Sequence, residues 1–259
     1  MSEKDNLFES PCEWRKFMKY LIEENRYILN ERWQRFIRSI LHTSKKREYI
    51  LKAGRILARA RIGILPVETE NEEGVSNYFE YPWPPDEMGA PPSKDATAGR
   101  LNPNGISYLY LSSDEETAIA EVRPWRRADI SVGYFEILND QRIVNLSKDQ
   151  REWITFGESL TPDELEESIW ASINGTFSQP VSPQDQPLHY VPSQYLAEVF
   201  KLHGFDGVGY RSSLNNNGFN IVLFNPNCAQ LKNWQIFNVA DIEYKFGKSG
   251  RPLLCKDKK

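Results

Sequence analysis

Apolar residues recur at helical intervals along the first fifty residues of the chain. Over residues 12–42 the apolar and aromatic positions lie three and four apart, which is the spacing of one helix face. Residues 13–53 contain neither Pro nor Gly, and polar residues interrupt the pattern at residues 25–30. We therefore expect two helices that are separated near residues 25–30 and followed by a basic segment at residues 45–47.

Strict alternation replaces the helical spacing at residues 55–65, RILARARIGIL, and predicts a strand. Residues 66–103 are polar and rich in proline, which is incompatible with a regular helix or a central strand. We expect a loop there, and so long a loop in a compact domain is either functional or disordered. Its aromatic residues are Tyr78, Phe79, Tyr81 and Trp83. They indicate that the loop packs against the domain, which favours a function.

Strands and helices follow one another irregularly along the rest of the chain. The patterns predict strands at residues 105–114, 131–138, 141–146, 204–213 and 219–226, and helices at residues 115–123, 153–174 and 193–203. Clustered strands with helices between some of them favour an α+β fold with a mixed sheet curled around a cleft. We expect a helical extension at residues 1–52 that packs on a main domain at residues 53–259. The alternative is that the extension docks a partner or a second protomer.

The composition is that of a soluble globular protein, with 40% hydrophobic and 26% charged residues. A formal net charge of -4 disfavours nucleic acid as the main partner, because phosphate binding leaves a basic footprint. The 3 Cys and 3 His are scattered, so we expect neither a disulfide framework nor a zinc site. The chain starts without the apolar run of a signal peptide, and it has no stretch of membrane-spanning length. These features predict a cytoplasmic protein.

Three arginines near the proline-rich segment are candidates for anion binding. Arg59 and Arg61 share one face of the first predicted strand of the main domain, because side chains alternate along a strand. They either hold a phosphate or pyrophosphate bidentately or face solvent beside carboxylate partners, and the sequence favours neither. Arg100 lies in the turn-rich segment GRLNPNG, directly before a strand. Loops in such positions often carry binding groups, although these turn sequences are common.

An acid and a tyrosine are the next candidates. Tyr110 lies in an apolar strand, and Glu121 has apolar neighbours on nearly every side in the sequence of its short helix. An acid in apolar surroundings is either paired or functional. Arg123 is the partner that a purely structural role would give to Glu121.

Two serines and an asparagine close the set of candidates. Ser212 and Ser213 end a predicted strand, and Asn220 starts the next one after a polar turn. Hydroxyl and amide groups at a strand end hold phosphate oxygens or a ribose in many proteins. The polar chemistry of a hairpin turn explains the same residues, and on the sequence alone it is the favoured interpretation.

Taken in order, these segments resemble the RES domain. The resemblance covers roughly residues 53–230, through the motifs ARAR, MGAPP, GRLNPNGISYLYLSSDEETAIAEVRP and YVPSQYLAEVFKLHGFDGVGYRSSLNNNGFNIVLFNP. It implies a fold related to ADP-ribosyltransferases and the activity of a bacterial toxin that degrades NAD⁺. It implies NAD⁺ as a substrate, no cofactor, and phosphate or water as the acceptor. The alternatives are ADP-ribosyl transfer to a protein or nucleic acid, and an inactive NAD-binding module. The implied partner is an antitoxin, often of the helix-turn-helix type.

The resemblance also implies roles for individual residues. It assigns Arg100, Tyr110, Glu121 and Ser212 as catalytic, and Arg59, Arg61, Ser213 and Asn220 as substrate-binding. Arg59 is favoured over Arg61, and Ser212 over Ser213. Cleavage of an N-glycosidic bond passes through an oxocarbenium-like state, which a carboxylate beside the ribose stabilises. Guanidinium groups then hold the pyrophosphate or an attacking phosphate, and no metal ion takes part.

Overall fold

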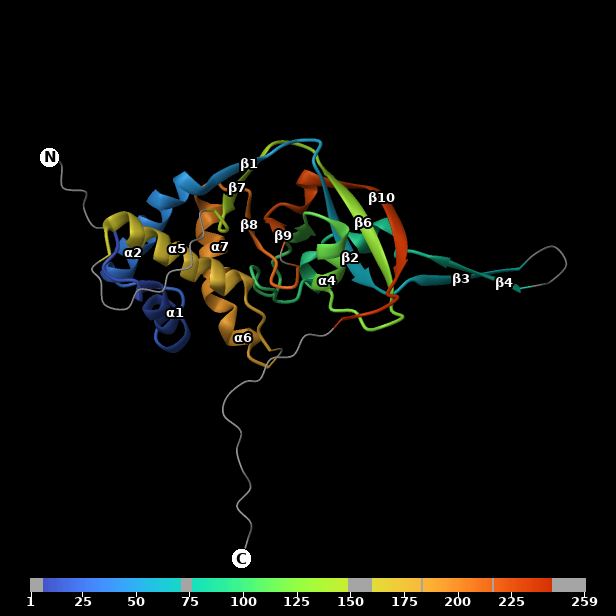
Figure 1. Ribbon diagram of the computed structural model, residues 1–259, viewed down its shortest axis with the longest axis horizontal. Helices are drawn as coiled ribbons and strands as arrows, with labels where there is room; N and C mark the ends of the chain where they lie inside the picture. Colours follow the sequence, from blue (N-terminus) through green and yellow to red (C-terminus); the bar gives the residue numbers. More distant parts are fainter. Residues whose placement is uncertain (1–6, 71–75, 149–159, 183, 216, 244–259) are drawn as a thin grey trace, which may run out of the picture.

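The computed structural model describes residues 7–70, 76–148, 160–182, 184–215 and 217–243. An eight-stranded sheet runs through the molecule (Figure 1). In spatial order it consists of β1 (Glu48–Leu51), β7 (Gln141–Asn145), β8 (Gly207–Arg211), β9 (Phe219–Leu223), β5 (Leu109–Ser112), β2 (Ile56–Ile62), β6 (Asp129–Ile137) and β10 (Ala229–Asn238). β7 and β8 are parallel, and the other neighbouring strands are antiparallel. The predicted mixed sheet is therefore confirmed.

Most of the helices gather at one end of the molecule, α4 (Glu115–Glu121) lies near its middle beside β2, and a hairpin extends from the other end (Figure 1). The other helices are α1 (Glu13–Glu23), α2 (Glu31–Ser44), α3 (Pro85–Met88), α5 (Pro162–Ser178), α6 (Gln186–His189) and α7 (Val191–Leu202). Short 3-10 turns are η1 (Lys45–Arg47), η2 (Ser93–Asp95) and η3 (Pro226–Cys228). The described part of the chain contains no helix long and apolar enough to cross a membrane.

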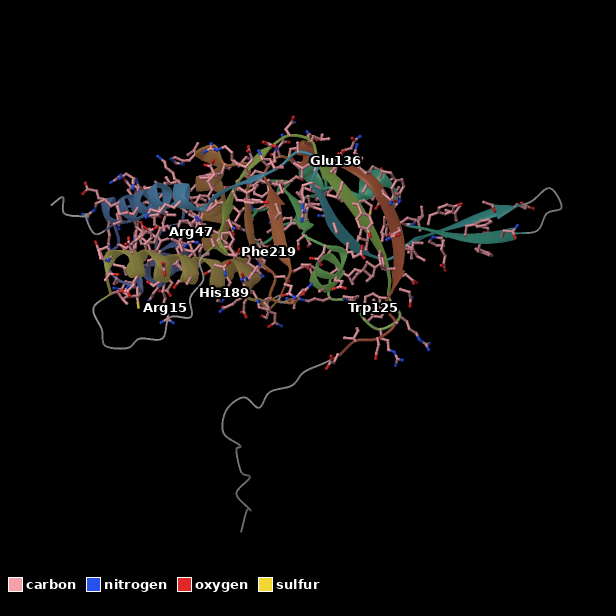
Figure 2. The ribbon with its side chains drawn as sticks, turned by 45° about the horizontal axis from the view of Figure 1, so that its top comes forward. Arg15, Arg47, Trp125, Glu136, His189 and Phe219 are labelled. Carbon is pink, nitrogen blue, oxygen red and sulfur yellow. The ribbon has the colours of Figure 1, made fainter. Side chains whose placement is uncertain are left out.

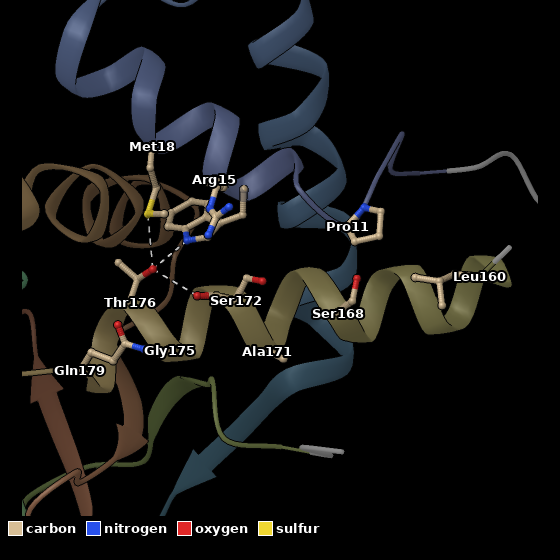
Figure 3. A pocket seen from close by; sticks show the side chains of 11 residues that line it. Pro11, Arg15, Met18, Leu160, Ser168, Ala171, Ser172, Gly175, Thr176 and Gln179 are labelled. Carbon is tan, nitrogen blue, oxygen red and sulfur yellow. Dashed lines mark hydrogen bonds between the residues drawn. The ribbon is translucent and has the colours of Figure 1, made fainter. Parts of the chain in front are cut away.

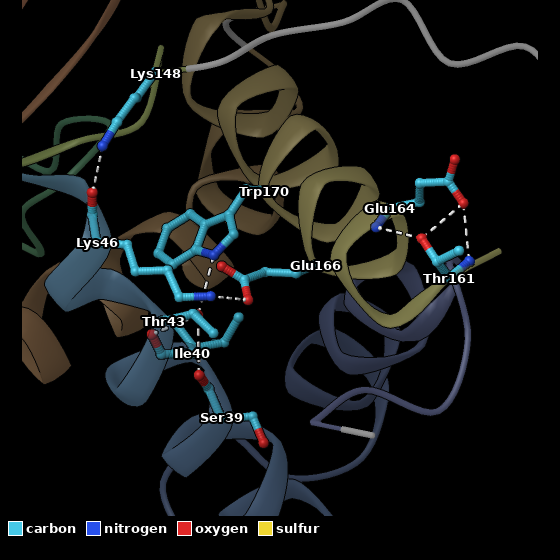
Figure 4. Close-up of polar contacts among 9 residues, drawn as sticks. All are labelled: Ser39, Ile40, Thr43, Lys46, Lys148, Thr161, Glu164, Glu166 and Trp170. Atoms are coloured by element: carbon cyan, nitrogen blue, oxygen red, sulfur yellow. Dashed lines mark hydrogen bonds and ion pairs between the residues drawn. The ribbon is translucent and has the colours of Figure 1, made fainter. Parts of the chain in front are cut away.

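The first two helices form at the predicted places and pack on the main domain. Their apolar faces enter one core cluster with residues of α5, α7 and the sheet. The indole Nε1 of Trp170 donates a buried hydrogen bond of 3.1 Å to Thr43 Oγ1, and Lys46 forms an ion pair of 2.7 Å with Glu166 (Figure 4). Thr161 is the N-cap of α5, and its side chain and that of Glu164 form a capping box (Figure 4). The N-terminal part of the predicted 153–174 helix lies outside the described residues.

The prediction of a continuous loop at residues 66–103 is wrong. A hairpin of β3 (Leu65–Glu70) and β4 (Ser76–Tyr81) forms inside it. Proline is tolerated in a two-stranded hairpin because each strand keeps one free edge. The predicted packing of the aromatic residues is also wrong at the hairpin, where Tyr78 is 72% and Phe79 50% exposed. Trp83 does pack, and its Nε1 donates 3.1 Å to the carbonyl of Ile62.

Besides the hairpin, the structure contains two further strands that were not predicted from the sequence, β1 and β10. β1 directly follows the basic residues Lys45–Arg47 and pairs with β7. β10 follows the last predicted strand and pairs with β6 along the edge of the sheet. A bulge at Lys232 interrupts this pairing between Leu231 and Asn233, and Lys232 Nζ lies 2.8 Å from a carboxylate oxygen of Glu136.

The central strands carry apolar side chains on both faces. Val144, Val208 and Val222 belong to the cluster that includes the helices. Side chains of the opposite face, such as Ile143, join a second cluster with residues of β2 and β6. These central strands therefore have one face covered by helices and one face that packs against residues of β2 and β6.

Helix α4 lies where the two halves of the sheet meet. β2 pairs with β6 along its length but with β5 only at Ala58 and Ser112. Asp114 caps the helix by accepting hydrogen bonds of 2.7 Å from the backbone N–H and the hydroxyl of Thr117. Partial burial raises the pKa of Asp114, but the hydrogen bonds from Ser113 and Thr117 outweigh this effect and hold the pKa below its usual value. The cap fixes the start of α4, and the last residue of the helix is Glu121.

Candidate functional site

A cavity of about 300 Å³ opens beside α4 at the junction of the two sheet halves. Side chains from β2, β5, α4, β8 and β9 line it. Four of the predicted site residues are among them: Arg59, Tyr110, Glu121 and Asn220. Residues that are far apart in the sequence thus converge on one cavity.

Two hydrogen bonds orient the carboxylate of Glu121 at the end of α4. Its Oε1 accepts 2.7 Å from Ser212 Oγ and 2.6 Å from Asn220 Nδ2. Its Oε2 has no hydrogen-bond partner among the described residues. None of the ion pairs in the described part of the chain joins Glu121 to Arg123. A fixed carboxylate with one oxygen available can interact with a cation or a ribose hydroxyl in the cavity.

The predicted apolar surroundings of Glu121 are wrong, since its side chain is exposed. The helix has seven residues and Glu121 is the last of them, so its sequence neighbours do not enclose it. Polar groups from a different strand and loop surround the carboxylate instead.

Asn220 is itself held by a residue that the sequence analysis missed. Ser112 Oγ donates 2.9 Å to Asn220 Oδ1, and both side chains are buried. Because the amide oxygen is occupied, the Nδ2 group has to face Glu121. Ser112 ends the motif LYLS and pairs directly with Asn220 in the antiparallel register. The sequence contains the serine, but it does not contain this register.

The structure distinguishes the two candidate serines. The buried hydroxyl of Ser212 donates to Glu121 and accepts from the backbone N–H groups of Leu214 and Asn215 at 3.1 and 3.2 Å. Ser213 is exposed, and within the described residues it makes no side-chain hydrogen bond. Ser212 therefore links the carboxylate to the turn that follows β8, and Ser213 lies outside the cavity.

That turn docks closely against α4. The amide of Asn215 donates 2.9 Å to Thr117 Oγ1. A Cβ atom at Gly218 would lie 2.0 Å from the same hydroxyl oxygen, so only glycine fits there. The close approach fixes the distance between Ser212 and Glu121.

Tyr110 connects the cavity to the loop at residues 99–105. Its hydroxyl donates 2.7 Å to Asn102 Oδ1 and accepts 3.0 Å from the backbone N–H of Leu101. Burial strongly raises the pKa of Tyr110, so the phenol keeps its proton. A Cβ atom at Gly99 would lie 2.7 Å from the phenol oxygen, which explains the glycine at that position.

The two arginines of β2 have different surroundings. Arg59 lines the cavity, and its Nη1 donates 3.2 Å to the carbonyl of Tyr110. Its Nε is buried without a partner, and the ion pairs of the described residues do not include Arg59. Arg61 instead pairs with Glu87 at 2.7 Å and stacks over the ring of Trp83. Burial, and then the charge of Arg61, lower the pKa of Arg59, as expected for a cation that lacks a counter-ion.

Arg100 does not line the cavity. Its Nη1 donates 3.2 Å to the carbonyl of Thr176 and 2.8 Å to that of Gln179, at the C-terminal end of α5. The guanidinium lies 5.2 Å from the ring centroid of Tyr190. A cation at this helix end stabilises the unpaired carbonyls and the helix dipole. Arg100 therefore ties the loop of Tyr110 to α5.

A second hollow, of about 500 Å³, lies between α1 and α5 (Figure 3). Its wall consists mainly of small and apolar side chains, and Arg15 is its one ionisable residue. Thr176 Oγ1 there accepts 2.9 Å from Trp14 Nε1. The hollow contains none of the predicted site residues, and the described residues nowhere form a group of three or more His, Cys, Asp or Glu suited to a metal ion.

Comparison with known proteins places the chain in a family. No curated protein sequence matches it. A solved structure, that of the M. tuberculosis MbcT–MbcA toxin–antitoxin complex, is similar to it with 13% identity and a TM-score of 0.43, covering 78% of this chain and 93% of that chain. The family model of the RES domain matches residues 77–246, well over half of the chain. The match includes the loop at residues 99–105, α4 and the turn after β8, and the chain therefore belongs to the RES domain family.

Proposed function

We propose that this protein cleaves NAD⁺ at the bond between nicotinamide and ribose. The observation that carries the proposal is the carboxylate of Glu121, held by Ser212 and Asn220 in the cavity that Arg59 also lines. The guanidinium of Arg59 has no ion-pair partner among the described residues. A carboxylate and a guanidinium match the two charged parts of the reaction, the ribosyl cation and the phosphates. Membership of the RES domain family supports the same activity.

The proposed step breaks the C1′–N bond, and its electron pair leaves with nicotinamide, which departs as a neutral molecule. The positive charge then lies on the ribose ring, and the carboxylate of Glu121 stabilises it. An oxygen of inorganic phosphate forms the new bond to C1′ and gives ADP-ribose 1-phosphate. With water as the acceptor, the product is ADP-ribose and one proton is released.

Arg59 supplies the anion-binding part of the site. Its Nη1 is bonded to the carbonyl of Tyr110, and its Nη2 has no hydrogen-bond partner among the described residues, so a phosphate oxygen in the cavity can accept from it. Guanidinium binds phosphate through parallel hydrogen bonds and stays charged when buried. Arg59 therefore holds either the pyrophosphate of NAD⁺ or the attacking phosphate.

Tyr110 lines the proposed site, whereas Arg100 lies outside it and supports it. Tyr110 forms part of the cavity wall, where its ring can contact the nicotinamide. Arg100 bonds to the end of α5, so we assign it a positioning role in the loop of Tyr110. Arg61 is occupied by Glu87, and Ser213 is turned away from the carboxylate, so neither has a role in the step as we propose it.

We further propose that the activity makes the protein a bacterial toxin whose partner is an antitoxin. NAD⁺ depletion harms any cell, so a chain with this activity needs an inhibitor while it is produced. An antitoxin that covers the cavity beside α4 would provide it. Co-expression with the protein encoded by the adjacent gene should restore growth and yield a complex that copurifies. Growth arrest that the neighbouring protein leaves unchanged would contradict the antitoxin part of the proposal.

One assay tests the enzymatic proposal and its alternatives. Purified protein is incubated with NAD⁺ labelled in the adenosine part, with and without phosphate, and nicotinamide release is followed. Release that requires phosphate indicates phosphorolysis, and release without it indicates hydrolysis. Label that remains on protein or nucleic acid indicates ADP-ribosyl transfer. Absence of nicotinamide release under every condition would leave only an NAD-binding module and refute the proposed cleavage.

A further inference from the structure

A further pocket lies on the face of β8 and β9 opposite to the candidate site. We call it the back-face pocket, and it has a volume of about 270 Å³. Its apolar wall comes from Leu51, Leu57, Ile143 and Ile221, which belong to β1, β2, β7 and β9. Strand β9 separates it from the proposed active site, because successive side chains of a strand point to opposite faces.

Strand β9 shows this separation residue by residue. Asn220 faces the carboxylate of Glu121, whereas its neighbours Phe219 and Ile221 line the back-face pocket. Figure 2 labels Phe219 on β9 in the middle of the molecule. The two sites thus have different lining residues, although β2, β8 and β9 contribute to both.

A glycine in the middle of the sheet creates the pocket. Gly209 of β8 lies beside the pocket, where any other residue would project a side chain into it. A Cβ atom at Gly209 would lie 3.5 Å from Ile143 Cγ2 and 3.9 Å from the carbonyl oxygen of Asn220, which are ordinary van der Waals distances. Neither packing nor a positive φ therefore requires glycine here. A strand glycine without such a requirement marks a place that a ligand can approach.

The rim of the pocket combines aromatic side chains with unused hydrogen-bond donors. Tyr49 is 52% and Phe219 38% exposed, which is unusual for large side chains beside an apolar hollow. Arg55 lines the pocket, and its guanidinium makes no hydrogen bond or ion pair with any described residue. Asn145 Oδ1 accepts from Ser147, but the Nδ2 of Asn145 has no partner in the described part of the chain.

We propose that the back-face pocket binds a small carboxylate with an apolar body. The apolar wall takes the body, and Arg55 together with the amide of Asn145 takes the carboxylate, which guanidinium binds bidentately. The volume equals that of about nine liquid water molecules, so the ligand has about ten non-hydrogen atoms. Octanoate has this size and chemistry and serves as the probe.

Binding is measured on the full chain by NMR of isoleucine methyl groups labelled with ¹³C. Octanoate should shift the methyl signals of Ile143 and Ile221 saturably. The signals of Ile169 and Ile173 in α5, which belong to the other cluster, should stay in place. Octan-1-ol, which has the same chain without the carboxylate, should bind at least about tenfold more weakly. Absence of saturable shifts below the micelle concentration, or equal affinities for the two probes, would overturn the proposal.

Three variants localise the site. Gly209→Val fills the pocket and should abolish the octanoate shifts, and Gly209→Ala, which adds one methyl group, should weaken binding about threefold. Arg55→Ala should weaken octanoate binding about tenfold and leave octan-1-ol binding unchanged. Circular dichroism and the unmoved signals of α5 control for folding. Parent affinity in Arg55→Ala, or saturable shifts that persist in both Gly209 variants, would show that octanoate binds elsewhere.

Discussion

Glu121→Gln is the substitution that tests the proposed reaction most directly. The amide oxygen of glutamine can keep the hydrogen bonds from Ser212 and Asn220, so the local geometry should survive. Those bonds change from charge-assisted to neutral, which should lower the free energy of unfolding by about 1 kcal/mol. For a chain of this size such a loss corresponds to a decrease of roughly 2–4 °C in Tm.

The effect of Glu121→Gln on turnover should be much larger than its effect on stability. A unit charge about 4 Å from the ribosyl cation contributes about 1 kcal/mol in bulk water and about 4 kcal/mol near a protein surface. The carboxylate is exposed in the free protein, but bound NAD⁺ would cover it, so we expect a contribution of about 2–4 kcal/mol. This corresponds to a decrease of roughly 30-fold to 1,000-fold in kcat, with a small change in KM.

The assay is nicotinamide release at saturating NAD⁺, and Glu116→Gln is the matched control. Glu116 lies in the first turn of the same helix, and its exposed side chain has no hydrogen-bond partner among the described residues. The Glu116→Gln substitution removes the same negative charge as Glu121→Gln and should leave kcat within about twofold of the parent value. A Glu121→Gln variant that turns over NAD⁺ at the rate of the control would refute the assigned role of the carboxylate.

Three further predictions concern the groups that support the site and the fold. Tyr110→Phe leaves the backbone N–H of Leu101 without its partner, and it should lower the free energy of unfolding in urea by about 1–3 kcal/mol. A decrease smaller than about 0.5 kcal/mol would contradict this role of the hydroxyl. Thr43→Val leaves the buried indole N–H of Trp170 unpaired and should cost a similar roughly 1–3 kcal/mol, whereas Thr43→Ser should cost less. Asp114→Asn tests the effect of pH, since the hydrogen bonds of Asp114 lower its pKa against the opposing effect of burial. The charged cap stabilises the protein above the unfolded pKa of about 3.9, and this contribution is lost as the pH falls through the lower folded value. The advantage of the parent over Asp114→Asn in thermal unfolding should therefore shrink as the pH falls below about 4. An advantage that stays constant as the pH falls further would contradict this prediction.

The sequence predicted the elements whose signals are local. The apolar spacing of α1 and α2 and the alternation of β2 each lie within one segment. β1 and β10 were missed because neither has the alternating burial of a strand with one face in the core, and β10 is largely exposed at the edge of the sheet. Their formation depends on partners that are distant in the sequence.

The sequence named four of the residues that line the candidate site, Arg59, Tyr110, Glu121 and Asn220, but it did not predict their arrangement. Resemblance to a family selected Glu121 and Ser212, and their hydrogen bond is in the structure. The pairing of Ser112 with Asn220 depends on the register between β5 and β9, which no local pattern specifies. The bonds from Arg100 to the end of α5 likewise depend on how a distant helix packs.

The bulge in β10 affects how the chain behaves at high concentration. An open sheet edge is a template for strands of other molecules, and β10 is ten residues long. The extra residue at Lys232 breaks the regular spacing of the edge and places an ammonium group beside Glu136. An incoming strand would lose continuous pairing at this point and meet a charge. Deleting Lys232 would restore an unbroken edge and should make the protein prone to fibril formation.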